Sequence, residues 1–105
     1  MKIRDIINGE KPTLSFEVFP PKKDTDFANV EAAAFGIAGL SPSYMSVTYG
    51  AGGSTKGHTI ALAQAIQEKY NVPTIAHLTC VCANREGIKA ALSEMKSAGI
   101  ENILA

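Results

Sequence analysis

The sequence has no excess of charge of either sign, since its 105 residues include 10 Lys and Arg and 10 Asp and Glu. A balanced chain has no electrostatic reason to bind nucleic acid or an anionic membrane surface. It also lacks any apolar run close to the roughly 20 residues that a membrane-spanning helix needs. Its charged first residues lack the apolar core of an export signal. These absences predict a protein that binds neither nucleic acid nor membrane.

Cysteine is scarce, and the two cysteines, Cys80 and Cys82, are too close in sequence to form a disulfide that would stabilise the fold. Without an export signal they indicate a reducing, cytoplasmic compartment. Two cysteines supply at most half of the roughly four well-placed ligands that a zinc site needs. We therefore predict no metal site, and we interpret His58, at the start of a predicted helix, as a surface residue.

Three short segments rich in β-branched and aromatic residues recur at a spacing of 30 residues. They are residues 14–19, 44–49 and 74–79. A fourth segment, 102–105, follows the third at nearly the same spacing. Apolar residues at helical spacing fill the intervals, over 26–38, 57–70 and 85–98, and a short opening helix is predicted over 3–7. Such repeats predict parallel strands joined by right-handed helical crossovers.

Each of the three longer predicted helices combines an apolar stripe with a candidate N-cap. The candidate caps are Asp24 or Thr25 for the first helix, Ser54 or Thr55 for the second and Asn84 for the third. Gly99 can adopt the left-handed backbone conformation that ends a helix, so we expect the third helix to end there. The stripes are Phe27, Val30, Ala34 and Ile37; Ile60, Ala63, Ile66 and Tyr70; and Ile88, Ala91, Leu92 and Met95. We expect all three stripes to face the sheet.

Two architectures contain strand–helix repeats of this kind. One is the (β/α)8 barrel of about 250 residues, and the other is a doubly wound sheet of about five strands. Parallel sheets are normally covered on both faces, and four barrel strands alone would leave an inner face and two edges open. We find no linker or second domain. We therefore interpret residues 1–105 as the N-terminal part of a single (β/α)8 barrel domain, about three and a half units truncated in the fourth strand.

Functional groups of both architectures lie beyond the carboxyl ends of the strands. Glu17 interrupts the first apolar segment shortly before Pro20 and Pro21 end it. A carboxylate at that place is partly desolvated, which favours the protonated form and suits a general acid. The alternative is a glutamate on the outer face, paired with Lys22 or Lys23.

The two other strand ends give weaker signals. Three glycines and two hydroxyl residues in the loop 50–55 precede a predicted helix, whose free N–H groups can bind an anion. This loop lacks the lysine of a P-loop and the glycine spacing of a dinucleotide fingerprint, so a simple N-cap loop is an equal alternative. His77, in the third strand, is flanked by apolar residues and is either a core histidine or a ligand-binding one.

Four segments together resemble the methylenetetrahydrofolate reductase family. They are Ser15–Pro21 (SFEVFPP), Val47–Ser54 (VTYGAGGS), Ala76–Cys80 (AHLTC) and Gly99–Ala105 (GIENILA). Each motif is modest alone, but the four stand in the family's order and at its spacing. The resemblance extends from about residue 14 to the end of the chain.

The resemblance implies an FAD-dependent barrel enzyme of one-carbon metabolism and methionine biosynthesis. NADH or NADPH would reduce the flavin, which would pass a hydride to 5,10-methylenetetrahydrofolate and so form 5-methyltetrahydrofolate. Glu17 matches the position of the acid that protonates the folate ring and opens it. Thr48 and His77, with Tyr49 beside them, match positions that contact the flavin. We also expect a homo-oligomer.

The family's fourth strand runs on into an Arg-Gly-Asp segment that touches the flavin, and this sequence ends before it, at Ala105. We therefore expect the full reaction of a longer parent protein, and little activity or flavin affinity from the 105 residues alone. Two other functions stay open. One is a short non-catalytic protein that self-associates as a half-barrel through its open edges. The other is a different barrel enzyme that binds a pterin or a phosphate at the 50–55 loop.

Overall fold

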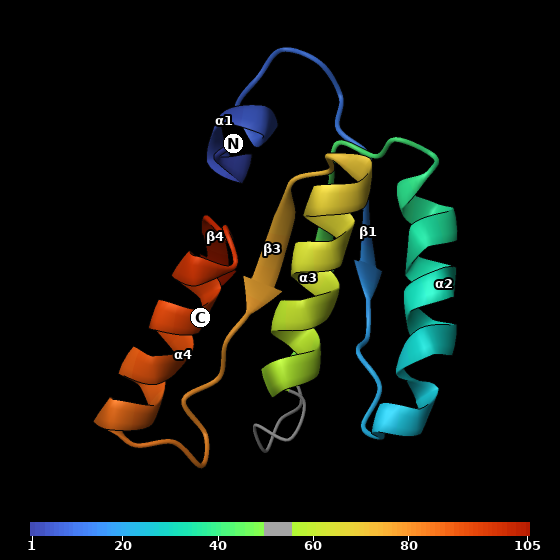
Figure 1. Cartoon of the computed structure of the whole chain (residues 1–105). Coiled ribbons are helices and arrows are strands. Elements are labelled where there is room, and N and C mark those ends of the chain that lie inside the picture. The colour runs from blue at the N-terminus through green and yellow to red at the C-terminus, as the bar shows by residue number, and fades with distance from the viewer. Residues whose placement is uncertain (50–55) are drawn as a thin grey trace.

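The chain forms a four-stranded parallel sheet whose successive strands are joined by helices, as a computed structural model shows (Figure 1). The structure describes residues 1–49 and 56–105. The loop 50–55, which contains the predicted anion site and the predicted caps Ser54 and Thr55, lies outside the described residues.

Every predicted strand and helix is present in the described part of the chain. The strands are β1 (Ser15–Val18), β2 (Tyr44–Val47), β3 (Thr74–His77) and β4 (Asn102–Leu104). The helical segments are α1 (Ile3–Ile7), the 3-10 turn η1 (Asp24–Asp26), α2 (Phe27–Ala38), α3 (Lys56–Tyr70) and α4 (Arg85–Ser97). Strands β2 and β3 end earlier than predicted, so Thr48 and Tyr49 lie in the segment that follows β2.

The strands lie in the order in which they occur along the chain, β1-β2-β3-β4, and each pairs in parallel with the next. A doubly wound sheet reverses its strand order at a switch point, whereas a (β/α)8 barrel adds each strand beside the last. The observed order confirms the predicted parallel α/β fold. It is the arrangement of the N-terminal part of a (β/α)8 barrel.

One face of the sheet is covered by helices and carries the core. Met45 and Val47 of β2 are fully buried, as are Leu62 and Ile66 of α3. In Figure 1, α3 crosses in front of the sheet between α2 and α4. The core cluster draws on all three helices, because the buried set also includes Ala34 of α2 and Met95 of α4. The predicted stripes therefore face the sheet, with one exception.

The exception is Leu92, which is 41% exposed. Successive helical residues are rotated by about 100°, so Leu92 is turned away from its buried neighbour Ala91. Contact with the core is concentrated on Ala91 and Met95, with Ile88 beside them. The stripe of α4 is therefore narrower than the sequence pattern predicted.

The predicted helix ends are confirmed for α4 and wrong for α2. The Asn84 side chain accepts a hydrogen bond from the Gly87 N–H at 2.8 Å, and Gly99 adopts a left-handed φ of 74°. Helix α2 instead continues from η1, and its N-cap Asp26 makes no side-chain cap hydrogen bond. Because η1 already winds the chain into a turn, neither Asp24 nor Thr25 stands at the cap position.

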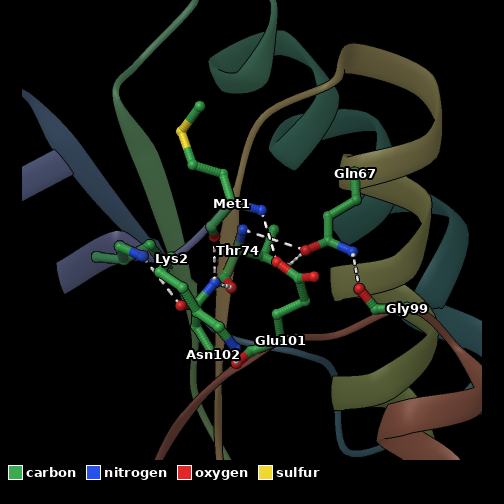
Figure 2. A network of polar contacts seen from close by, with 8 residues as sticks. Met1, Lys2, Gln67, Thr74, Gly99, Glu101 and Asn102 are labelled. Atoms are coloured by element: carbon green, nitrogen blue, oxygen red, sulfur yellow. Dashed lines mark hydrogen bonds and ion pairs between the residues drawn. The ribbon is translucent and has the colours of Figure 1, made fainter. Parts of the chain in front are cut away.

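The N-terminal segment is bound across the amino ends of the strands, at the top of Figure 1 (Figure 2). The Asn102 carboxamide accepts from the Ile3 N–H and donates to the Met1 carbonyl, each at 3.0 Å. The Met1 ammonium group contacts the Glu101 carboxylate at 2.6 Å. These contacts hold α1 in place, and Ile3 is only 3% exposed.

A second polar bridge lies beside this one (Figure 2). The Gln67 side chain of α3 accepts from the Thr74 hydroxyl at 2.8 Å and donates to the Gly99 carbonyl at 3.1 Å. Thr74 is fully buried, so this hydrogen bond satisfies a hydroxyl group that has left water. Gln67 thereby joins α3 to the start of β3 and to the turn that follows α4.

The different burial of the α4 side chains predicts different costs of truncation. Met95→Ala should lower the free energy of unfolding by about 2–5 kcal/mol, because it leaves a cavity in the core. Leu92→Ala, on the exposed side of the same helix, should cost less than about 1 kcal/mol. Urea unfolding followed by circular dichroism measures both. Equal losses for the two variants would contradict the helix orientation.

The contact between Met1 and Glu101 predicts a pH-dependent contribution to stability. The hydrogen bond from the Met1 ammonium group, helped by its charge and that of Lys2, holds the pKa of Glu101 below its usual value near 4.5. A lowered pKa means that the carboxylate stabilises the fold above that usual value, and that the contribution disappears as the pH falls through the lowered value.

Glu101→Gln in the untagged chain should therefore lower the unfolding midpoint at neutral pH and have no effect in strong acid. Thermal unfolding at several pH values provides the measurement, with Glu10→Gln, at another exposed carboxylate, as the control. A Glu101→Gln effect of the same size at every pH would show that the ionised pair does not stabilise the fold.

Candidate active site

Three polar side chains from neighbouring strands meet on the face of the sheet opposite the helix-covered core. The Ser46 hydroxyl of β2 lies 3.2 Å from Oε1 of Glu17 in β1 and 2.6 Å from Nε2 of His77 in β3. The same two atoms of Glu17 and His77 are 3.5 Å apart. The Ser46 hydroxyl is therefore hydrogen-bonded to both groups, and the carboxyl and imidazole groups lie within ion-pair distance of each other.

Strand alternation and parallel register produce this cluster. Glu17 is paired with Ser46 across β1 and β2. Val18 and Val47 beside them are buried against the helices, so Glu17 and Ser46 point to the other face. In β3, Ala76 is buried on the helix side, so His77 points to the open face. Ser46 is paired with Ile75, and His77, two residues further along β3, contacts the Ser46 hydroxyl diagonally.

The structure places Glu17 in this cluster, with about half of its side chain exposed. The Glu17 side chain is 49% exposed and that of His77 is 22% exposed. Glu17 lies on the open face with Ser46 and His77, and so not on the outer face that the alternative pairing with Lys22 or Lys23 required. His77 likewise lies on the open face and contacts polar groups, so it is not a core histidine.

Thr48 and Tyr49 follow β2 at its carboxyl end. The Thr48 N–H donates to the Val18 carbonyl at 3.0 Å, which continues the ladder between β1 and β2. The Thr48 carbonyl in turn accepts from the hydroxyl of Thr59, a fully buried residue of α3, at 2.8 Å. Tyr49 is partly buried and packs against the core cluster. Both residues are thus held by contacts to described elements.

A pocket of about 210 Å³ opens at the carboxyl ends of β3 and β4. Its lining consists of Tyr49, His77, Leu78, Thr79, Leu104 and Ala105. The pocket therefore brings two of the predicted flavin contacts, Tyr49 and His77, to one place, whereas Thr48 lies outside its lining. Aromatic, aliphatic and hydrogen-bonding groups are combined there, which is usual for small-molecule sites.

The prediction that His58 is a simple surface residue is wrong. Its side chain is only 21% exposed. Its Nδ1 lies 2.7 Å from the Pro21 carbonyl and its Nε2 lies 2.5 Å from the Asp24 carboxylate. The Phe27 ring packs beside it, with ring centroids 5.5 Å apart. His58 therefore ties the start of α3 to the segment between β1 and α2, and no local sequence pattern indicates such a contact.

Ser46 is the member of the cluster that sequence reasoning missed. Serine residues are common and mostly exposed, so one hydroxyl inside a strand gives little signal by itself. The signal that was present is positional. Ser46 precedes Thr48 by two residues and therefore shares its side of the strand, and the parallel register places it opposite Glu17.

Other kinds of site have little support in the residues that the structure describes. Within 1–49 and 56–105, no group of three or more His, Cys, Asp or Glu side chains is placed to share a metal ion. Cys80 and Cys82 are both exposed free thiols. None of the described helices is long and apolar enough to cross a bilayer.

The sheet order and the polar cluster define a class: a β/α barrel segment with a carboxyl, a hydroxyl and an imidazole group clustered near the carboxyl ends of its strands. Comparison with known proteins then identifies the family. The sequence profile of methylenetetrahydrofolate reductase matches residues 2–105. The chain belongs to the methylenetetrahydrofolate reductase family, as its four motifs predicted.

Individual relatives agree with the family match. The chain is 36% identical over 104 residues to methylenetetrahydrofolate reductase (NADH) 1 of Arabidopsis thaliana, and 38% identical over 104 residues to the protein of that name from Zea mays. Each match covers 99% of this chain and 18% of the relative. The 5,10-methylenetetrahydrofolate reductase of Pectobacterium carotovorum is 30% identical over 92 residues, which cover 88% of this chain and 31% of that protein. The chain thus spans less than a third of these relatives.

The hydrogen bond from the buried Thr59 hydroxyl to the Thr48 carbonyl predicts that two variants of Thr59 differ in stability. Thr59→Val keeps the shape of the side chain but leaves the Thr48 carbonyl without this donor, and should cost about 1–3 kcal/mol of unfolding free energy. Thr59→Ser keeps the hydroxyl and should lose only the methyl contribution, about 1 kcal/mol. Chemical unfolding of the three proteins measures the difference. A Thr59→Val protein as stable as the wild type would rule out a structural role for this bond.

Proposed function

We propose that this protein reduces 5,10-methylenetetrahydrofolate to 5-methyltetrahydrofolate with FAD as cofactor and NADH or NADPH as electron donor. In this proposal, residues 1–105 form the N-terminal part of a (β/α)8 barrel and supply its acid group. The observation that carries it is the contact of Glu17 with His77 and Ser46 at the carboxyl ends of the strands. Membership in the family and the NADH named for the plant relatives support it.

The residues of the strand-end pocket fit the chemistry of a flavin. Tyr49, Leu78 and Leu104 offer the apolar and aromatic surface that a flat ring system needs, and His77 and Thr79 offer polar atoms at its edge. At about 210 Å³, the pocket is large enough for part of such a cofactor only. Tyr49 and His77, with Thr48 beside them, would hold that part. When bound, the flavin supplies the hydride chemistry, and the protein supplies orientation and electrostatics.

Glu17 is the proposed proton donor. The methylene carbon of the folate bridges two nitrogen atoms, and it becomes a good hydride acceptor only when one C–N bond opens. Protonation of the departing nitrogen favours that opening, which is the task of a general acid. Glu17 suits this role because it stands on the open face, half exposed, with Ser46 and His77 to fix its orientation.

The remaining walls of the site would come from segments outside this chain, which spans 18% to 31% of the relatives. The open face and the exposed edge residues Leu14 and Leu104, at 60% and 53% exposure, are where further barrel strands or another subunit would pack. The free thiols of Cys80 and Cys82 suit a reducing compartment, so we place the activity in the cytoplasm, and we propose a homo-oligomer.

Glu17→Gln in the flavin-loaded protein should separate the two halves of the reaction. Reduction of the flavin by NADH or NADPH needs no protonated Glu17 and should proceed, whereas transfer to the folate should fall by about 10²–10⁴-fold. Stopped-flow absorbance of the flavin follows each half in turn. Glu10→Gln, at an exposed carboxylate outside the cluster, is the matched control. Folate reduction at the wild-type rate by Glu17→Gln would exclude Glu17 as the acid.

The 105 residues in isolation should neither bind FAD stoichiometrically nor catalyse folate-dependent oxidation of NADH. The reason is that the pocket at the carboxyl ends of β3 and β4, at about 210 Å³, has room for only part of a flavin. Equilibrium dialysis with FAD and an NADH oxidation assay test this on the purified chain, and gel filtration reports whether it self-associates. Stoichiometric flavin binding with activity would show that this segment alone is a complete enzyme.

A further inference from the structure

The contacts of Ser46 allow only two arrangements of protons. A serine hydroxyl has one proton to donate and lone pairs that accept. If Ser46 donates to an ionised Glu17, it must accept from a protonated Nε2 of His77. If Ser46 donates instead to Nε2, then Nε2 is bare, and a protonated Glu17 donates to the Ser46 oxygen. Both arrangements use the same contacts, 3.2 Å to Glu17 and 2.6 Å to His77.

We propose that Ser46 is a proton relay that restores the proton of Glu17 from His77. In the step, the N–H bond at Nε2 of a doubly protonated His77 breaks and an O–H bond forms at Ser46. The original Ser46 proton passes to Oε1 of Glu17. An imidazolium and a carboxylate thereby become a neutral imidazole and a carboxylic acid, and the number of protons and the total charge are unchanged.

This inference rests on the proposed function, because that reaction consumes one proton for each hydride transferred. Glu17 gives its proton to the folate nitrogen and must recover one before the next turnover. His77 is the basic group whose Nε2 lies 2.6 Å from the Ser46 hydroxyl, so it is the nearest proton source within the cluster. Its side chain, 22% exposed, can take up a proton from water before the folate binds.

Ser46 is well placed for the relay because it stands between the two groups. The direct separation of Nε2 and Oε1 is 3.5 Å, longer than either contact made by the hydroxyl. Proton transfer requires short, aligned hydrogen bonds, so the path through the hydroxyl is better than the direct one. Ser46 acts through Glu17 and is a positioning and relay residue that need not touch the folate.

The kinetic test uses the flavin-loaded protein with NADH and 5,10-methylenetetrahydrofolate both in excess, so that each protein must recover its proton many times. Ser46→Ala should slow folate reduction over repeated turnovers by at least about tenfold. Ser46→Thr keeps a hydroxyl and should restore most of the rate. Ser15→Ala, which removes an exposed serine from the same face of β1, is the matched control and should behave as wild type.

Solvent deuterium separates a relay from a merely structural role. In the wild type and in Ser46→Thr, two protons move together, so the rate should fall with a curved dependence on the deuterium fraction. In Ser46→Ala that curvature should be lost. A wild-type rate in Ser46→Ala, or a slow rate with an unchanged isotope dependence, would overturn the relay.

A measurement on the 105-residue chain keeps the relay testable if folate reduction is absent. NMR at a single fixed pH follows the ¹⁵N signal of His77 Nε2 and the ¹³C signal of the Glu17 carboxyl. Ser46→Ala should shift both signals, because it removes a hydrogen-bond partner from each group, whereas Ser46→Thr should leave both close to their wild-type positions. The His58 signals should stay unchanged in both variants and report an intact fold.

The two kinds of failure can be told apart. A wild-type protein that does not reduce the folate, but whose His77 and Glu17 signals both shift in Ser46→Ala, contradicts the proposed function and leaves the relay standing. A wild-type protein that reduces the folate, but in which Ser46→Ala changes neither the isotope dependence nor these two signals, contradicts the relay and leaves the proposed function standing.

Discussion

The parallel register of the first three strands is the constraint on which the rest of the structure depends. It pairs Glu17 with Ser46, and it brings His77 within 2.6 Å of the same hydroxyl. Because side chains alternate along each strand, the same register sends Val18 and Val47 into the helix-covered core. A slip of one residue would exchange the two faces, burying the carboxyl group and exposing the core valines. The same strand register therefore determines both which residues form the core and which form the polar cluster.

The elements of the fold could be predicted from the sequence because local patterns encode them: apolar strands 30 residues apart, helical stripes, and Asn84 and Gly99 at the ends of α4. The family could be predicted because its motifs keep their order and spacing. What local patterns could not supply are contacts between distant segments. Ser46 gains its place only from its neighbours in β1 and β3, and His58 meets Asp24 through the packing of α3. The exposure of Leu92 likewise depends on how α4 sits against the sheet.

The two ends of the sheet have different tasks. At the amino ends, Asn102, Gln67 and Glu101 use their polar atoms to bind the N-terminal segment and the turn after α4, so these contacts stabilise the fold. At the carboxyl ends, Glu17 and His77 remain partly exposed, with polar atoms available to a ligand. This division is the one found in β/α barrels, where stability is concentrated at one end of the strands and chemistry at the other.

The most direct test of the central claim is the visible absorption spectrum of the native protein, purified from its source cells without added cofactor. We predict the spectrum of an oxidised flavin, which NADH or NADPH bleaches in the absence of oxygen and 5,10-methylenetetrahydrofolate then restores, with 5-methyltetrahydrofolate as the product. A protein that carries no flavin, or whose bleached flavin is not restored by the folate, would contradict the account.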